Sequence, residues 1–174
     1  MWRLNVNTQD VIKSQYHAAL GMLQEVVARC PDAVWRSVNP SMPFWRVAFH
    51  ALFYTHLYLQ PTEKDFAPWP KHRDESQHMG PLPWPPHDEP KIGEPYSRDE
   101  ILEYLDFVRA QVEEKVGVLD LEGESGFFWL PFSKLELQLY NIRHVQQHAG
   151  ELSQRLAESG VEIDWVGSGR GGQG

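Results

Sequence analysis

The sequence predicts an all-α protein that folds as a bundle of four helices. Four segments carry apolar residues at helical spacing. No segment shows the apolar–polar alternation or the hairpin turns that are typical of a sheet. A proline or glycine follows three of the four segments, as expected at helix ends. With 174 residues, the chain is about one domain long and can bury a substantial core.

The first two predicted helices are joined by a short linker rich in proline. We expect the first helix over residues 8–30, ending at Pro31. Its apolar face consists of residues at helical spacing: Ile12, Tyr16, Leu20, Leu23 and Val27. We expect the second helix over residues 43–59, closed by Pro61. Its sequence, PFWRVAFHALFYTHLYL, is apolar nearly all the way round, which predicts the most buried helix of the bundle.

A long proline-rich loop follows the second helix. Residues 61–96 contain nine of the thirteen prolines, and neither a helix nor a central strand can run through such a segment. A loop of this length in a compact domain is either functional, as a lid or wall, or disordered. Its aromatic residues Phe66, Trp69 and Trp84 favour a loop that packs down over the structure.

The last two predicted helices carry clear boundary signals. Residues 97–100, Ser-Arg-Asp-Glu, form a capping-box sequence that opens a helix reaching about residue 116. The fourth helix is expected over residues 133–158, with Gly160 just beyond its end. We expect residues 1–166 to form one domain and the glycine-rich residues 167–174 to form a flexible tail.

Composition excludes several classes of protein. The formal charge of −8 argues against a nucleic-acid-binding protein and against an anionic membrane surface as partner. No apolar run reaches the ~18 residues that a membrane span needs, and no signal peptide is visible. The single cysteine, Cys30, excludes an internal disulfide and predicts a cytoplasmic protein. Any metal ion would therefore be held by histidine and carboxylate rather than by a set of thiolates.

A pair of histidines in the fourth helix has the spacing of a metal site. His144 and His148 are four residues apart, so their imidazoles lie about 40° apart around the helix and can converge on one point. The alternative is two histidines on a solvated face, because such a pair also arises by chance. Both residues flank the apolar stripe centred on Ile142, which favours an interior site.

A third ligand is expected from a facing helix. His50 lies midway along the second helix and is either a hydrogen-bonded core residue or a ligand. His56 points well away from the His50 face and is expected to be peripheral. His17 can face either the bundle or solvent. The loop histidines are expected to be solvated, unless one of them caps the site: His72, His78 and His87.

These histidines, in their sequence context, match a known family. His50 within FWRVAFHALFYTHLYL, followed about ninety residues later by His144 and His148 within NIRHVQQHAGEL, resembles the DinB-like (YfiT-like) metalloenzyme superfamily. The segment EPYSRDEILEYLDFVR also resembles the third helix of that family, and the likeness covers residues 8–160.

The resemblance implies an up-down-down-up four-helix bundle, usually a homodimer, here with the long proline-rich loop between helices two and three. It implies one divalent metal ion on His50, His144 and His148, with zinc or nickel as first candidates and iron or manganese as alternatives. Some members are thiol-dependent S-transferases or maleylpyruvate isomerases. This implies a small-molecule substrate and a low-molecular-weight thiol as partners.

Three neutral imidazoles would leave coordination positions open, which is the pattern of a catalytic site. Such an ion can lower the pKa of water or a thiol, or polarise a carbonyl oxygen. Glu151 is expected to accept a hydrogen bond from a ligating histidine, to act as a general base, or to face solvent. Arg155 binds an anionic substrate group or offsets the helix dipole. Tyr54, one turn from His50, is a candidate proton donor or a core residue.

Three functions are compatible with these patterns. The first is a metal-dependent enzyme that acts on a small molecule by S-transfer or hydrolysis. The second is a non-catalytic binding or stress-response module stabilised by the metal. The third is a metal-free interaction protein in which the histidines are hydrogen-bonded.

Overall fold

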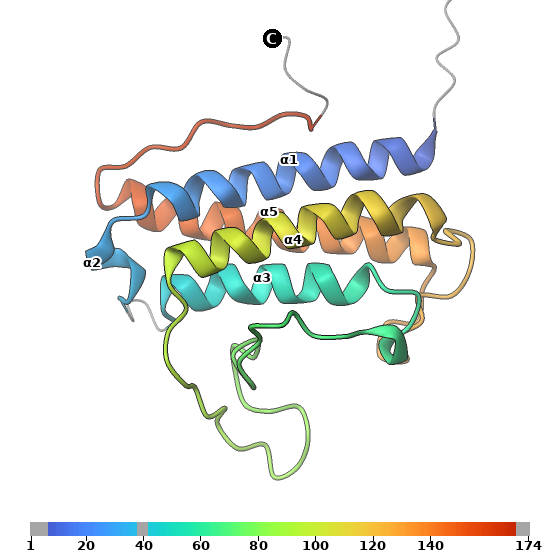
Figure 1. Ribbon diagram of the computed structural model, residues 1–174, viewed down its shortest axis with the longest axis horizontal. Helices are drawn as coiled ribbons and strands as arrows, with labels where there is room; N and C mark the ends of the chain where they lie inside the picture. Colours follow the sequence, from blue (N-terminus) through green and yellow to red (C-terminus); the bar gives the residue numbers. More distant parts are fainter. Residues whose placement is uncertain (1–6, 38–41, 170–174) are drawn as a thin grey trace, which may run out of the picture.

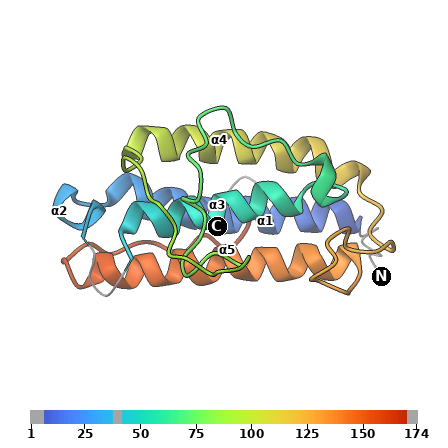
Figure 2. The ribbon, with the colours of Figure 1, turned by 90° about the horizontal axis from the view of Figure 1, so that it is seen from below.

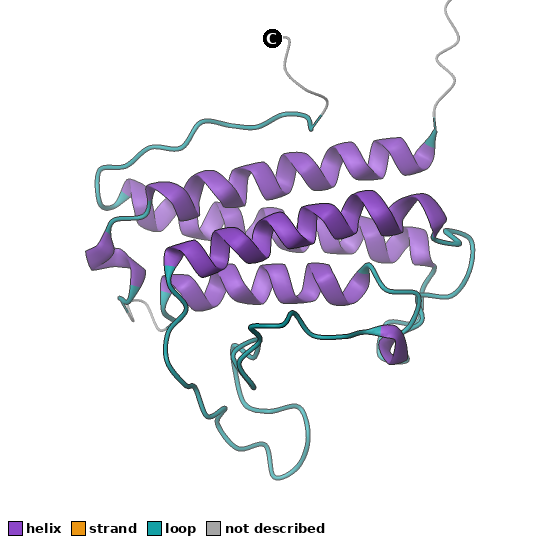
Figure 3. Ribbon diagram, in the orientation of Figure 1, coloured by secondary structure: helices purple, strands orange, loops and turns teal. Residues whose placement is uncertain are grey.

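The computed structural model describes residues 7–37 and 42–169, and every regular element in these residues is helical (Figure 3). This confirms the all-α prediction. Five α-helices are present: α1 (Thr8–Arg29), α2 (Asp32–Trp35), α3 (Phe44–Tyr58), α4 (Arg98–Lys115) and α5 (Lys134–Ala157). Two 3-10 turns complete the list: η1 (Glu63–Asp65) and η2 (Val116–Val118).

The four long helices begin and end within one residue of the predicted bounds, because their boundary signals are local. Asn7 accepts a hydrogen bond from the backbone N–H of Gln9 at the start of α1. At the start of α4, Ser97 and Glu100 cap each other's backbone N–H groups, which confirms the predicted capping box. The short helix α2 was not predicted, since a single turn is too short to show a periodicity.

The long helices pack around one apolar core (Figure 1, Figure 2). α1 and α3 each lie against both α4 and α5. α3 is the most buried, as predicted, with thirteen of its fifteen residues buried. The two exceptions are His50 and Tyr54, which follow one another by one helical turn. The most buried helix thus has one partly exposed strip on its surface, formed by His50 and Tyr54.

The segment between α3 and α4 lies on the outer side of α3, away from α1 (Figure 1). Trp69 is buried and stacks on Tyr104 of α4, with ring centroids 4.6 Å apart. Phe66 packs edge-on against Phe53 of α3. Trp84 is 50% exposed and touches the ring of His78 within the same segment. Part of this segment therefore adds to the core, and part projects outward.

After α5 the chain returns along α1 (Figure 1). The backbone N–H of Gly169 donates to the carbonyl of Ser14 at 3.0 Å, and Val166 packs against Gly21. Residues 170–174 of the predicted tail lie outside the described residues. The bounds of the domain and of the tail remain predictions. None of the helices described is both long and apolar enough to cross a membrane.

Candidate metal centre

The fold brings three predicted ligands to one point. His50 comes from α3, and His144 and His148 come from α5, which packs against α3. The Nε2 atom of His144 lies 3.0 Å from Nε2 of His50 and 3.1 Å from Nε2 of His148. The ligand atoms of all three residues lie within 4.8 Å of one another. The helical spacing of His144 and His148 thus does align their rings, as the sequence predicted.

These separations match those of nitrogens that share one metal ion. Two imidazole nitrogens bound at about 2.0–2.1 Å lie about 2.9 Å apart at right angles and about 3.3 Å apart at the tetrahedral angle. The two measured distances, 3.0 and 3.1 Å, fall between these values. The residues present therefore fit a small divalent cation.

Hydrogen bonds at the far side of two rings turn their lone pairs inward. The Nδ1–H of His50 donates to the backbone carbonyl of Gln77 at 2.6 Å. Nδ1 of His148 lies 3.2 Å from a carboxylate oxygen of Glu151, to which it donates. With Nδ1 protonated in both rings, both Nε2 atoms carry lone pairs that face His144. Converging lone pairs repel each other unless a proton on Nε2 of His144 or a cation lies between them.

Glu151 is the centre of a chain of polar contacts behind His148. Its second carboxylate oxygen accepts a hydrogen bond from Nη2 of Arg155, one turn further along α5. Nη1 of Arg155 donates to the carbonyl of Met42 at 2.7 Å. Arg155 is 9% exposed, and both of its terminal nitrogens are used. Glu151 and Arg155 thus support the ligand His148, while a direct role of either residue toward substrate remains a prediction.

The environment keeps His50 and His144 neutral. Burial lowers the pKa of His50 to about 4, against an opposing contribution from the bond to Gln77. Burial, followed by the neighbouring histidines, lowers the pKa of His144 to about 3. Neutral imidazole is the form that binds a metal, so both residues are ready to ligate well below neutral pH.

A cavity of about 270 Å³ lies against two of the cluster histidines. It is lined by these two candidate ligands and by four aromatic residues: His50, His144, Tyr54, Tyr58, Trp129 and Tyr140. The ring of Tyr54 lies 4.7 Å from that of His50, centroid to centroid. Burial raises the pKa of the Tyr54 hydroxyl above its ordinary value, so the group stays protonated.

The model of one protein family matches residues 15–152, which is most of the chain. That family is the DinB superfamily. The chain belongs to the DinB superfamily. The match spans all three histidines of the cluster and confirms the assignment made from their sequence context. Comparison with curated proteins and with solved structures gave no match.

The other histidines of this DinB-superfamily chain lie apart from the cluster. His56, expected to be peripheral, is instead 3% exposed, because Phe66 from the loop and Phe107 from α4 cover it. His17 bonds to Glu113 at 2.5 Å. Among the loop histidines, His72 is half-buried on the ring of Phe49 and His78 is half-buried against Trp84, so the expectation of a solvated residue was wrong for both. His87 is exposed, as expected.

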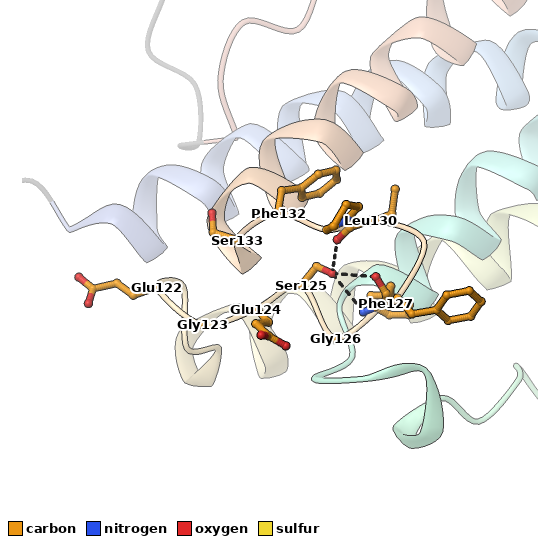
Figure 4. Close-up of a pocket in the computed structure, with 11 residues that line it drawn as sticks. Glu122, Gly123, Glu124, Ser125, Gly126, Phe127, Leu130, Phe132 and Ser133 are labelled. Carbon is orange, nitrogen blue, oxygen red and sulfur yellow. Dashed lines mark hydrogen bonds between the residues drawn. The ribbon is translucent and has the colours of Figure 1, made fainter.

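A larger cavity, of about 670 Å³, lies within residues 122–133 and is distinct from the histidine cluster (Figure 4). The hydroxyl of Ser125 organises it by bonding to the backbone of Phe127 and Leu130. None of the cluster histidines lines it, and it holds no comparable group of ligands. Its relevance to the site is indirect, since the same loop supplies Trp129 to the aromatic cavity.

Sequence reasoning missed four contributors to the site of this DinB-superfamily member. The carbonyl of Gln77 has no signal in the sequence, because every residue carries a carbonyl. Tyr58, Trp129 and Tyr140 belong to three different segments, which only the fold brings together. Tyr58 and Tyr140 had a detectable signal, because Tyr58 follows Tyr54 by one helical turn and Tyr140 precedes His144 by one turn.

Proposed function

We propose that this DinB-superfamily protein is a metal-dependent enzyme that acts on a small molecule. His50, His144 and His148 would hold one divalent ion, and the reaction would take place in the aromatic cavity beside them. The observation that carries the proposal is the convergence of three Nε2 atoms, two of them with hydrogen bonds that direct their lone pairs inward. The cavity against His50 and His144 supports access for a substrate.

A divalent ion on three neutral imidazoles keeps its full positive charge, so it would supply Lewis acidity toward a carbonyl, a thiol or water. The side chains of the protein would donate the proton, orient the substrate and support the ligands. Tyr54, with its hydroxyl kept protonated by burial, is the candidate proton donor. The surrounding aromatic rings would exclude water and orient the substrate. Glu151 and Arg155 would hold the ring of His148 in the orientation that binds the metal.

Several finer features belong to the same proposal. The metal is zinc or nickel, with iron or manganese as alternatives. The reaction is S-transfer from a low-molecular-weight thiol, or hydrolysis. The protein is a cytoplasmic homodimer, and its long helices form an up-down-down-up bundle with a proline-rich loop between α3 and α4. The neighbour relations of α1, α3, α4 and α5 support that topology.

One observation favours the alternative of a non-catalytic, metal-stabilised module. The ligands come from α3 and α5, so a bound ion would also tie two neighbouring helices together. A metal that served stability alone would raise the unfolding temperature. A metal of that kind would not catalyse a reaction between any thiol and any electrophile.

The decisive experiment is the metal content of the purified protein and of the His148→Ala variant. We expect about one divalent ion per chain in the wild type and loss of binding in His148→Ala. His17→Ala, which removes a histidine of α1 that bonds to Glu113, serves as the matched control and should retain the ion. Absence of metal after growth in supplemented medium would refute the proposal. A screen of model electrophiles with low-molecular-weight thiols then separates an enzyme from a module.

A further inference from the structure

The aromatic cavity has a shape and size that restrict its ligand. Four ring-bearing side chains come from three segments: Tyr54 and Tyr58 from α3, Tyr140 from α5, and Trp129 from the loop before α5. A cavity of about 150 Å³ accepts a benzene ring. The volume of about 270 Å³ therefore accommodates one ring with a substituent. Stacking and edge contacts with aromatic walls favour a flat ligand over a branched aliphatic one.

The side chains that line the cavity carry no permanent charge. No carboxylate is among its lining residues. Glu151, the carboxylate beside the cluster, is already engaged by His148 and Arg155. An ion on three neutral histidines would add two positive charges with no anionic ligand to offset them.

Arg143 provides a cationic group in an adjoining cavity. A second cavity, of about 390 Å³, adjoins the first through two shared residues, Tyr140 and His144. Arg143 lines this second cavity beside Gln146 and Gln147. Its side chain is exposed, and it has no ion-pair or hydrogen-bond partner among the residues described. A free guanidinium next to two amides suits a carboxylate or phosphate group.

We propose that the substrate is a small organic anion with a flat ring. Its ring would lie among Tyr54, Tyr58, Trp129 and Tyr140, and its anionic group would bind Arg143. This inference rests on the proposed function, because it names the substrate class of that same site. Aromatic walls alone would equally suit a quaternary ammonium ion. The cationic surroundings decide against that ligand, since a cation here would face Arg143 and the metal without a compensating carboxylate.

The test compares three probes that share a ring and differ in charge: benzoate, benzamide and benzyltrimethylammonium. Dissociation constants are measured by calorimetry on the zinc-loaded protein. We expect benzoate to bind at least tenfold more tightly than either other probe. Arg143→Gln should weaken benzoate binding about tenfold and leave benzamide binding unchanged. Arg29→Gln removes the same charge from the exposed end of α1 and should change neither. Trp129→Leu should weaken benzoate and benzamide alike.

The same titrations on chelator-treated protein separate this inference from the proposed function. Dependence of benzoate binding on Arg143 in both forms supports the anion site, even if elemental analysis finds no native metal. Benzoate binding that is insensitive to Arg143→Gln means that the metal takes the carboxylate directly, and it overturns the proposal. Equal or tighter binding of benzyltrimethylammonium overturns it as well. So does the absence of binding by all three probes at millimolar concentration.

Discussion

The Nδ1 atom of His50 lies 2.6 Å from the backbone carbonyl oxygen of Gln77, in the segment between α3 and α4. This bond fixes the tautomer of a candidate metal ligand through a loop that is distant in sequence. The loop is held in place one turn earlier on α3, where Nη2 of Arg46 donates to the carbonyl of His78. Arg46 and His50 therefore donate hydrogen bonds to the carbonyls of two consecutive loop residues, His78 and Gln77.

We expect Arg46→Met to weaken metal binding by about tenfold, because residues that orient a ligand contribute about 10–100-fold to affinity. Without the guanidinium, the 77–78 segment can move, and His50 loses its defined tautomer. Competition against a chromophoric chelator measures the affinity. The ¹⁵N shifts of His50 report the tautomer directly.

Arg98→Met is the matched control for this variant. Nη2 of Arg98 also donates to a backbone carbonyl, that of Cys30, but far from the histidines. The Arg98→Met variant should be less stable than the wild type and should bind the metal with the same affinity. Equal affinities for Arg46→Met and the wild type would show that the loop does not position His50.

Glu151→Gln tests the polar chain behind His148. The neutral amide accepts a weaker hydrogen bond from Nδ1 of His148 and no longer pairs with the charge of Arg155. We expect metal affinity to fall about 10–100-fold, with a small change in unfolding temperature. Glu158→Gln, an exposed change at the end of α5, should leave affinity intact. A Glu151 variant with unaltered affinity would reduce that residue to a surface glutamate.

The sequence predicted those parts of the fold and site that depend on local signals. Helix ends follow from caps such as Ser97 and Glu100, whose partners lie within one turn. The alignment of His144 with His148 follows from helix geometry alone. Burial of α3 follows from its continuous apolar sequence.

The remainder depends on contacts between distant segments. The burial of His56 comes from Phe66 and Phe107, which reach it from the loop and from α4. The bond between His50 and Gln77 requires the path of a loop that has no periodicity. Trp129 reaches the aromatic cavity because the turn before α5 folds back, which the composition of that turn does not reveal.

The buried histidine away from the cluster predicts an acid-sensitive stability. Burial lowers the pKa of His56 to about 4, and its Nδ1 lies within hydrogen-bond distance of the hydroxyl of Tyr104, at 3.2 Å. Between pH 6.5 and 4 the unfolded chain binds a proton that the folded chain does not, so stability falls as pH falls. One such group contributes a slope of at most about 1.4 kcal/mol per pH unit.

Urea unfolding of chelator-treated wild type and His56→Leu at pH 6.5 and 4.5 measures this contribution. Because His50 and His144 titrate in both proteins, their effect cancels in the comparison. We expect the variant to lose less stability between the two pH values than the wild type does. Identical losses would mean that His56 takes up its proton in the folded state.

A pair of glycines tests how the loop that carries Trp129 is anchored. Gly126 and Gly160 both have positive φ angles, 83° and 79°. A Cβ atom on Gly126 would lie 2.0 Å from the carbonyl oxygen of Pro61, whereas one on Gly160 would meet nothing within 4 Å. Gly160→Ala should therefore cost only the backbone preference, about 1 kcal/mol. Gly126→Ala adds a backbone clash, and we expect a loss of about 3 kcal/mol or more.

The two alanine variants should also differ at the site. Displacement of the 122–133 loop would move Trp129 away from Tyr58 and open the aromatic cavity, so the tryptophan emission of Gly126→Ala should shift to longer wavelength. Gly160→Ala lies beyond α5 and should keep the emission of the wild type. Metal affinity should stay unchanged in both variants, because none of the ligands belongs to that loop. If the Gly126→Ala and Gly160→Ala variants were equally stable, the loop would be able to move away from Pro61 with no further loss of unfolding free energy.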